Sequence, residues 1–119
     1  MSGSLGLLLF SSPVQHRTAE TVVTLAEAAS RSGRRVTIFL LADGVHCTSR
    51  AFLEAPQEGV VHRFARLPAD VAVVNCATCA RFRGLSDDSL IPNARNGTLE
   101  DLAELLRSAD RFLAFTGET

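Results

Sequence analysis

Apolar residues of this chain gather in short continuous runs that are separated by longer amphipathic segments. Three aliphatic runs have the length of strands buried on both faces, which is typical of a parallel sheet. They are residues 5–11 (LGLLLFS), 36–42 (VTIFLLA) and 70–75 (DVAVVN). A further run, residues 111–116 (RFLAFT), predicts the last strand.

Two segments between the runs repeat apolar residues at the spacing of a helix, which places them on one face. The first stripe consists of Ala19, Val22, Val23, Ala26 and Ala29, and the second of Leu99, Leu102, Ala103, Leu106 and Ala109. We expect Thr18 to cap the first helix and Gly33 to end it in a left-handed conformation. Thr98 and Asp101 resemble a capping box at the start of the second helix.

The remaining segments give weaker patterns. Residues 46–55 suggest a short helix stopped by Pro56, and residues 59–67 fit a loop, a helix or a strand. Residues 76–84 predict about two helical turns closed by a glycine. Residues 86–96 suggest a loop with an optional short strand around residues 90–91. The resulting alternation of strands and helices predicts one α/β domain, residues 1–119, with a mainly parallel sheet of about five strands and helices on both faces.

Composition and charge narrow the function classes. The chain has 12 basic and 13 acidic residues, a net charge of −1, so nothing suggests nucleic acid or an anionic membrane as a partner. No apolar run approaches the ~18 residues of a membrane span, and residues 5–10 lack the basic flank of a signal peptide. We therefore expect a cytoplasmic protein. Three cysteines in a reducing compartment are not expected to form a disulfide framework.

Cysteines follow two of the predicted strands. The carboxyl ends of parallel strands meet at one edge of a sheet, so we expect Cys47, Cys76 and Cys79 to face one rim. Cys76 stands where a strand turns into a helix, among backbone N–H groups without helical partners. A lowered thiol pKa is expected there. Cys79, three residues later, lies on the same helical face.

The C-x-x-C spacing leaves several interpretations open, and for Cys47 plain burial is favoured. The pair could cycle between dithiol and disulfide as in thioredoxin-like proteins. It could bind zinc, if two further ligands came from His16, His46, Cys47 or His62. It could also carry sulfur on Cys76. We expect Asp43 to form a turn, and Arg81 and Arg83 to lie favourably at a helix C-terminus.

Three segments resemble one protein family. Residues 73–85 (VVNCATCARFRGL) resemble the cysteine segment of the DsrE/TusD-like (DsrE/DsrF-like) sulfur-relay proteins, in which a strand runs into a cysteine, a short helix and an Arg-Gly-hydrophobic element. Residues 41–45 (LADGV) resemble the family's second-strand turn. Residues 99–115 resemble its final helix–strand unit.

The resemblance implies a three-layer α/β/α domain assembled into trimers or hexamers. It implies that Cys76 accepts sulfane sulfur as a persulfide and passes it to another sulfur-carrier protein. Cys79 then either resolves the persulfide or has only a structural role, packing against neighbouring side chains. No nucleotide, flavin or metal is required. The alternative is a non-catalytic oligomeric subunit or small-ligand-binding module with structural cysteines. Apolar residues that we expect at a subunit interface are Phe52, Leu53, Phe64 and Leu67.

Overall fold

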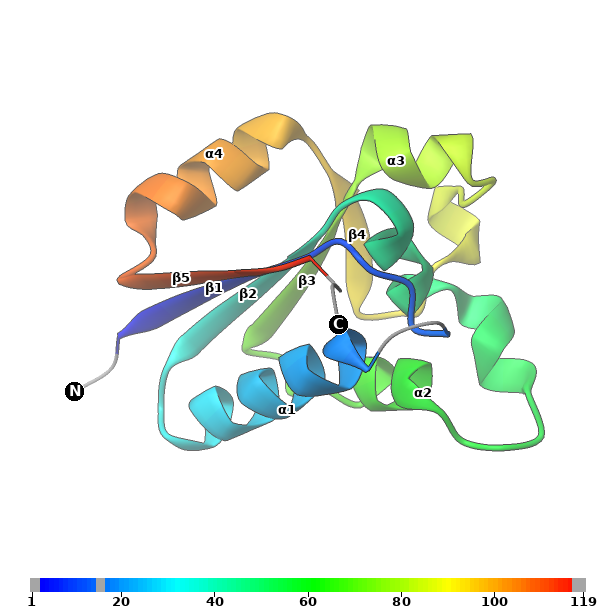
Figure 1. Cartoon of the computed structure of the whole chain (residues 1–119), viewed down its shortest axis with the longest axis horizontal. Coiled ribbons are helices and arrows are strands. Elements are labelled where there is room, and N and C mark those ends of the chain that lie inside the picture. The colour runs from blue at the N-terminus through cyan, green and yellow to red at the C-terminus, as the bar shows by residue number, and fades with distance from the viewer. Residues whose placement is uncertain (1–2, 15–16, 117–119) are drawn as a thin grey trace.

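A computed structural model describes residues 3–14 and 17–116. Five strands form one sheet in which every pairing is parallel, in the order β4-β3-β2-β1-β5 (Figure 1). They are β1 (Ser4–Leu9), β2 (Arg35–Leu40), β3 (Val71–Cys76), β4 (Ala94–Gly97) and β5 (Arg111–Phe115). The predicted α/β class with a parallel sheet is confirmed.

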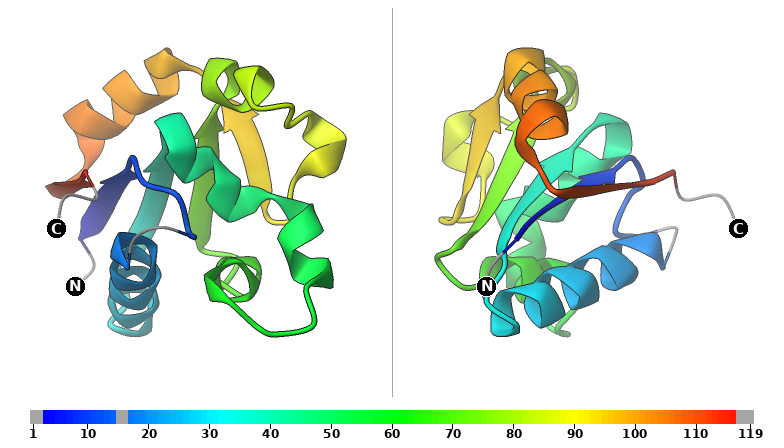
Figure 2. Two further views of the ribbon diagram at one scale, coloured as in Figure 1. Left: turned by 45° about the vertical axis from the view of Figure 1, so that its right-hand side comes forward. Right: turned by 90° about the vertical axis from the view of Figure 1, so that its left-hand side faces the viewer.

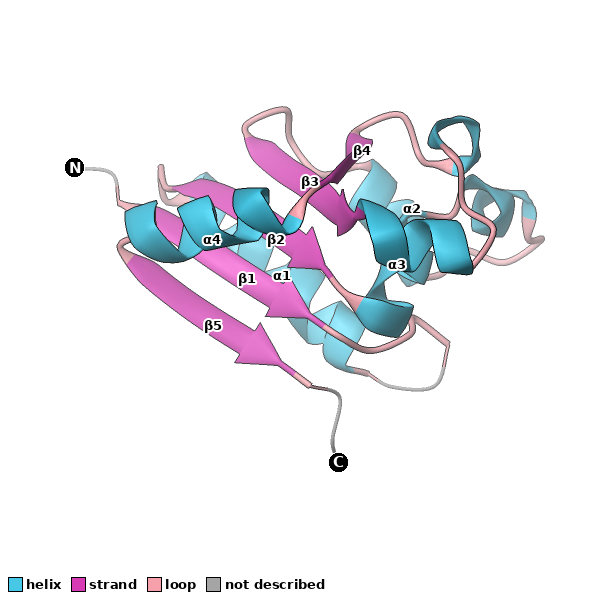
Figure 3. Ribbon diagram, turned by 90° about the horizontal axis from the view of Figure 1, so that it is seen from above, coloured by secondary structure: helices cyan, strands magenta, loops and turns pink. Residues whose placement is uncertain are grey.

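Helices cover both faces of this sheet, which gives three layers. One face carries α1 (Thr18–Arg31) and α2 (Val60–Ala65), and the other carries α3 (Ala77–Phe82) and α4 (Leu99–Ser108) (Figures 1 and 3). None of the helices in the described ranges has the length and apolar content needed to cross a membrane.

Strand side chains alternate between two apolar clusters, one on each face of the sheet. In β3, Val73 belongs to the larger cluster beneath α1 and α2, whereas Val74 packs with Leu8 and Phe39 on the face of α4. The same alternation directs Cys76 to the face of Val74. The position of the cysteine along β3 therefore decides which layer surrounds its sulfur.

Helix termini test the capping predictions. Thr98 caps α4: its side chain accepts the backbone N–H of Asp101, whose carboxylate accepts the N–H of Thr98. Gly33 has a φ of 89°, as expected after α1. The prediction for Thr18 is wrong, because the N-cap of α1 is Arg17 and no side chain caps that terminus.

The segment between β2 and β3 differs from the prediction. Instead of one helix over residues 46–55, two 3-10 helices (Ala42–Thr48 and Arg50–Glu54) precede α2. The first of them crosses close to β1, where a Cβ on Gly44 would lie 2.4 Å from the Leu9 carbonyl oxygen. Phe64 and Leu67 belong to the core, and Phe52 and Leu53 pack against it. Phe64 and Leu67 are therefore not available for the subunit interface that the sequence suggested, whereas for the partly buried Phe52 and Leu53 it stays a prediction.

The segment between α3 and α4 contains a strand in an unexpected place. A 3-10 helix (Asp87–Ser89) is followed by β4, which pairs with β3 from Val73–Ala94 to Cys76–Gly97. The optional strand at residues 90–91 is absent, and Leu90 forms only an isolated antiparallel bridge with Ser49.

Candidate functional site

Cys76 is both the last residue of β3 and the N-cap of α3. Its sulfur accepts the backbone N–H of Cys79 at 3.3 Å. The side chain packs with Leu8, Phe39 and Val74, and only 5% of the residue is exposed. The predicted position of Cys76 between strand and helix is confirmed. Its thiol is, however, more buried than we expected for a residue at the edge of the sheet.

Cys79 lies one helical turn further along α3 and is partly exposed. It contacts both apolar clusters, so it lies where the two layers meet at the end of the sheet. Its side chain lies close enough to Cys76 to raise the pKa of that thiol, and no disulfide joins them. The turn thus places a buried and a more accessible thiol beside each other.

Burial raises the pKa of Cys76 above its ordinary value of 9.0, and hydrogen bonding of the protonated Cys76 thiol to the Cys79 sulfur, which favours the neutral form, raises it further. The backbone N–H groups of Cys79 and Thr78 act in the opposite direction, as the sequence suggested, but they are outweighed. The prediction of a lowered pKa is therefore wrong for the chain on its own. Desolvation penalises the thiolate more than the turn stabilises it.

Cys47 lies apart from this pair. It belongs to the first 3-10 helix after β2, which packs against both α2 and α3, and it is fully buried in the larger cluster. Burial raises the pKa of its thiol far above 9.0. The expectation that all three cysteines face one rim is wrong for Cys47, because its side chain is buried in the core. The expectation of plain burial for Cys47 is confirmed.

An arginine holds α3 against the segment that follows β2. Arg83 donates from Nε to the Asp43 carboxylate at 2.9 Å and from a guanidinium NH₂ group to the Cys79 carbonyl oxygen at 3.1 Å. The predicted role of Arg83 at a helix C-terminus is confirmed. Its ion pair with Asp43 has no signal in the sequence, because 40 residues separate the two.

A buried amide fixes the end of β3 from the other face. Asn75 is fully buried and donates from Nδ2 to the Thr48 hydroxyl at 2.8 Å, and Thr48 in turn donates to the Val45 carbonyl oxygen. The Asn75 Oδ1 has no hydrogen-bond partner. An asparagine in an aliphatic run was the signal that could have revealed this contact. Together with Arg83, it anchors the residues on both sides of Cys76.

Within residues 3–14 and 17–116, no three His, Cys, Asp or Glu side chains converge in a way that could hold a metal ion. His16 lies outside the described residues. The His62 ring is already engaged: Nδ1 accepts the Gly59 N–H at 3.0 Å, and Nε2 lies 3.3 Å from the Leu53 carbonyl oxygen. The structure therefore lends no support to the zinc interpretation of the C-x-x-C motif.

Comparison with known proteins agrees with this architecture. The family model described as DsrE/DsrF-like matches residues 4–115, including every strand and both cysteines of the pair. The chain belongs to the DsrE/DsrF-like family. Proteins of this family are generally related to sulfur relay.

Individual relatives and solved structures match almost the whole chain. The crystal structure of the ychN protein from E. coli superposes with a TM-score of 0.84 at 30% identity, over 95% of this chain and 99% of that one. MTH1491 from Methanobacterium thermoautotrophicum shares the fold, with a TM-score of 0.64 at 12% identity over 96% of this chain and 98% of its own. The uncharacterized protein MJ0989 from Methanocaldococcus jannaschii is 27% identical over 114 residues, 92% of this chain and 96% of that protein.

Proposed function

We propose that this protein is a sulfur carrier that holds sulfane sulfur as a persulfide on Cys76 and passes it to a partner protein. The observation that carries the proposal is the β3–α3 turn, where the Cys76 sulfur accepts a backbone N–H at 3.3 Å and a second, more exposed cysteine follows one helical turn later. Membership of a family related to sulfur relay supports it. The proposed partners are other sulfur-carrier proteins in the cytoplasm, where thiols remain reduced.

The proposed transfer is a thiol exchange without net oxidation. The Cys76 thiolate attacks the outer sulfur of a donor persulfide, R–S–SH, and a new S–S bond forms to Cys76. The donor's S–S bond breaks, and its inner sulfur leaves as the thiolate R–S⁻. In the second step an acceptor thiolate attacks the outer sulfur of the Cys76 persulfide, and the Cys76 thiolate is released.

The burial of Cys76 has a kinetic consequence for this exchange. Only the thiolate attacks, and burial raises the pKa of Cys76 above 9.0. Below that pKa the thiolate fraction rises about tenfold per pH unit. We therefore expect sulfur uptake by the isolated protein to become faster with increasing pH and to show no plateau below about pH 9.

Mass spectrometry after incubation with a small-molecule persulfide tests the proposal. We expect a mass increase of about 32 Da, one sulfur atom, on the wild type and on Cys47→Ala. We expect Cys76→Ser to abolish the increase. Cys79→Ser serves as the matched neighbour and should keep the adduct on Cys76. A folded wild type that never gains sulfur, or an adduct that survives in Cys76→Ser, would contradict the proposal.

One observation favours the second candidate, a non-catalytic oligomeric subunit or small-ligand-binding module with structural cysteines. Cys76 is only 5% exposed and its thiol has a raised pKa, which also describes a packing residue. Iodoacetamide labelling of the native protein separates the two. A carrier should be alkylated at Cys76 before global unfolding, whereas a structural thiol should react only at the rate of unfolding.

A further inference from the structure

Apolar side chains surround the approach to Cys76. Phe10, Leu41 and Leu102 pack against the apolar cluster that contains this cysteine, and all three are only partly buried. Phe10 follows β1, Leu41 follows β2, and Leu102 belongs to the first turn of α4. Figures 2 and 3 show α3 and the start of α4 next to each other above this end of the sheet. A sulfur donor that reaches Cys76 between these two helices therefore meets an apolar surface.

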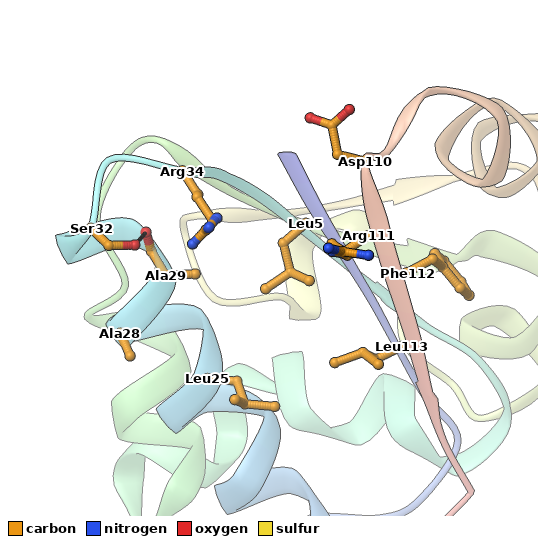
Figure 4. A pocket seen from close by; sticks show the side chains of 10 residues that line it. All are labelled: Leu5, Leu25, Ala28, Ala29, Ser32, Arg34, Asp110, Arg111, Phe112 and Leu113. Atoms are coloured by element: carbon orange, nitrogen blue, oxygen red, sulfur yellow. Dashed lines mark hydrogen bonds between the residues drawn. The ribbon is translucent and has the colours of Figure 1, made fainter. Parts of the chain in front are cut away.

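The open groove on the other face of the sheet does not lead to Cys76. Leu5, Leu25 and Leu113 line this groove, and its volume is about 720 Å³ (Figure 4). Leu113 is the register partner of Leu7, whose side chain belongs to the larger cluster beneath α1 and α2. The sheet thus separates the groove from Cys76, which packs on the face of α4. A donor has to approach from the face that carries α3 and α4.

An ion pair lies above Gly97, the residue of β4 that is the register partner of Cys76. A Cβ on Gly97 would lie 2.5 Å from Asp101 Oδ2 and 3.3 Å from a guanidinium nitrogen of Arg95. The two charged groups are 3.6 Å apart, so their charges offset each other. The Asp101 carboxylate also accepts the backbone N–H of Thr98. Arg95 therefore stands close to Cys76 with its charge already paired.

The arginines of α3 do not supply a free cation at this thiol either. Arg83 donates to the Cys79 carbonyl oxygen, but its guanidinium is paired with Asp43 at 2.9 Å. Arg81 is exposed, and because it follows Cys79 by two residues it lies about 200° around the helix from it. An anion brought against Cys76 would therefore lose hydration without gaining an unpaired partner from these arginines.

We infer that Cys76 accepts sulfur from persulfides that carry no charge close to the sulfur, and that it discriminates against donors with a nearby carboxylate. This inference rests on the proposed function. A cysteine persulfide within a protein chain belongs to the favoured class, because uncharged amide groups flank it. The persulfide of a C-terminal cysteine or of a small thiol acid belongs to the disfavoured class.

The transfer step shows where the discrimination arises. The Cys76 thiolate attacks the outer sulfur of the donor R–S–SH, an S–S bond forms to Cys76, the donor's S–S bond breaks, and R–S⁻ leaves. During this step the group R lies against the apolar side chains around Cys76. A carboxylate on R loses part of its hydration there, whereas an uncharged R does not incur this cost.

Two donors that differ by a single charge test the inference. They are the persulfide of N-acetylcysteine, whose carboxylate is ionised at neutral pH, and the persulfide of its methyl ester, which has no carboxylate. The initial rate of the mass increase of about 32 Da is measured in Cys79→Ser, so that Cys79 cannot take up sulfur. Each rate is divided by the rate of transfer from the same donor to 2-mercaptoethanol, which removes the intrinsic difference between the donors.

We expect the methyl ester to react at least about fivefold faster than the carboxylate by this normalised measure, a small part of the effect that full burial of an ion would have. Equal normalised rates, or a preference for the carboxylate, would overturn the inference.

Charge variants of the ion pair above Gly97 should shift this preference in opposite directions. Asp101→Asn keeps an oxygen that can accept the Thr98 N–H and leaves Arg95 unpaired, so the preference for the methyl ester should fall about threefold. Arg95→Gln leaves Asp101 unpaired and should increase the preference. Asp70→Asn is the control: it lies at the other end of β3, about 20 Å along the strand, beyond the range of an unscreened interaction.

Circular dichroism verifies that each variant is folded. An unchanged preference in both Asp101→Asn and Arg95→Gln would show that charge beside Cys76 does not select the donor, and the inference would be refuted.

The outcomes separate this inference from the proposed function. If both donors load Cys76 at equal normalised rates, the carrier function is supported and the selectivity is wrong. If neither donor adds sulfur to the folded protein, both are wrong.

Discussion

The absence of lysine and tyrosine makes this protein a direct test of how burial affects its thiols. All 12 basic side chains are arginine, so the cysteines are the only side chains that titrate between about pH 8 and pH 12. Burial raises the pKa of Cys47 in the folded protein, whereas the unfolded chain titrates near the ordinary value of 9.0. Raising the pH above 9 should therefore lower the free energy of unfolding, because the thiols ionise more readily in the unfolded chain than in the folded protein.

The sign and the size follow from proton linkage. Above pH 9 the unfolded state loses the Cys47 proton while the folded state keeps it. The stability that the protonated thiol contributes is therefore complete below pH 9 and is lost as the pH rises. The slope is about 1.4 kcal/mol per pH unit and per thiol, which amounts to about 2 kcal/mol from Cys47 at about pH 10.5. Cys76, whose pKa is also raised by burial, acts in the same direction.

Urea unfolding, followed by far-ultraviolet circular dichroism in the presence of a reductant, measures this effect. The wild type should lose stability steadily between about pH 9 and pH 10.5. Cys47→Ala leaves a small cavity and should be less stable at neutral pH, but its stability should depend on pH less steeply by about one proton. Parallel pH curves for the two proteins would show that the Cys47 thiol is not desolvated in the folded state, and the reasoning would be wrong.

Three further changes test local features. Gly44→Ala would place a Cβ 2.4 Å from a backbone oxygen of β1 and should lower the free energy of unfolding in urea by about 1–3 kcal/mol. Gly59→Ala is the control: no atom lies within 4 Å of the new Cβ, so the loss should be less than about 1 kcal/mol. Thr98→Ala removes the cap of α4 and should cost about 1 kcal/mol, and an unchanged midpoint would contradict the capping geometry. Arg83→Met removes the partly exposed ion pair with Asp43 and should lower the free energy of unfolding by no more than about 1 kcal/mol. It should also speed the alkylation of Cys76 and Cys79, because Arg83 no longer binds the Cys79 carbonyl oxygen. Equal labelling rates in the variant and the wild type would show that Arg83 does not hold α3 in place.

Local patterns predicted the elements whose sequences carry strong periodicity. Aliphatic runs located both ends of β1, β2, β3 and β5 to within two residues, and Thr98 located the start of α4. By contrast, β4 (ARNG) has no strand signal of its own. It is a strand because its backbone completes the hydrogen bonding of β3, and such pairing is a property of two distant segments.

The candidate site could be predicted only in part for the same reason. The sequence identified Cys76 at a strand-to-helix turn with Cys79 one turn later, because that placement depends on neighbouring residues. It did not reveal the contact of Arg83 with Asp43 or of Asn75 with Thr48. Both contacts join segments that are far apart in the chain.

The sequence by itself determined the α/β class, the parallel sheet and the position of the cysteine pair at the end of β3, since these follow from local periodicity and chain order. Only the tertiary structure decided that Cys47 and Cys76 lie in different apolar clusters, that both thiols are buried, and that the pKa of Cys76 is raised rather than lowered. The physical reason is that desolvation depends on which distant side chains pack around a sulfur atom. The local backbone at a helix start contributes only a smaller, opposing effect.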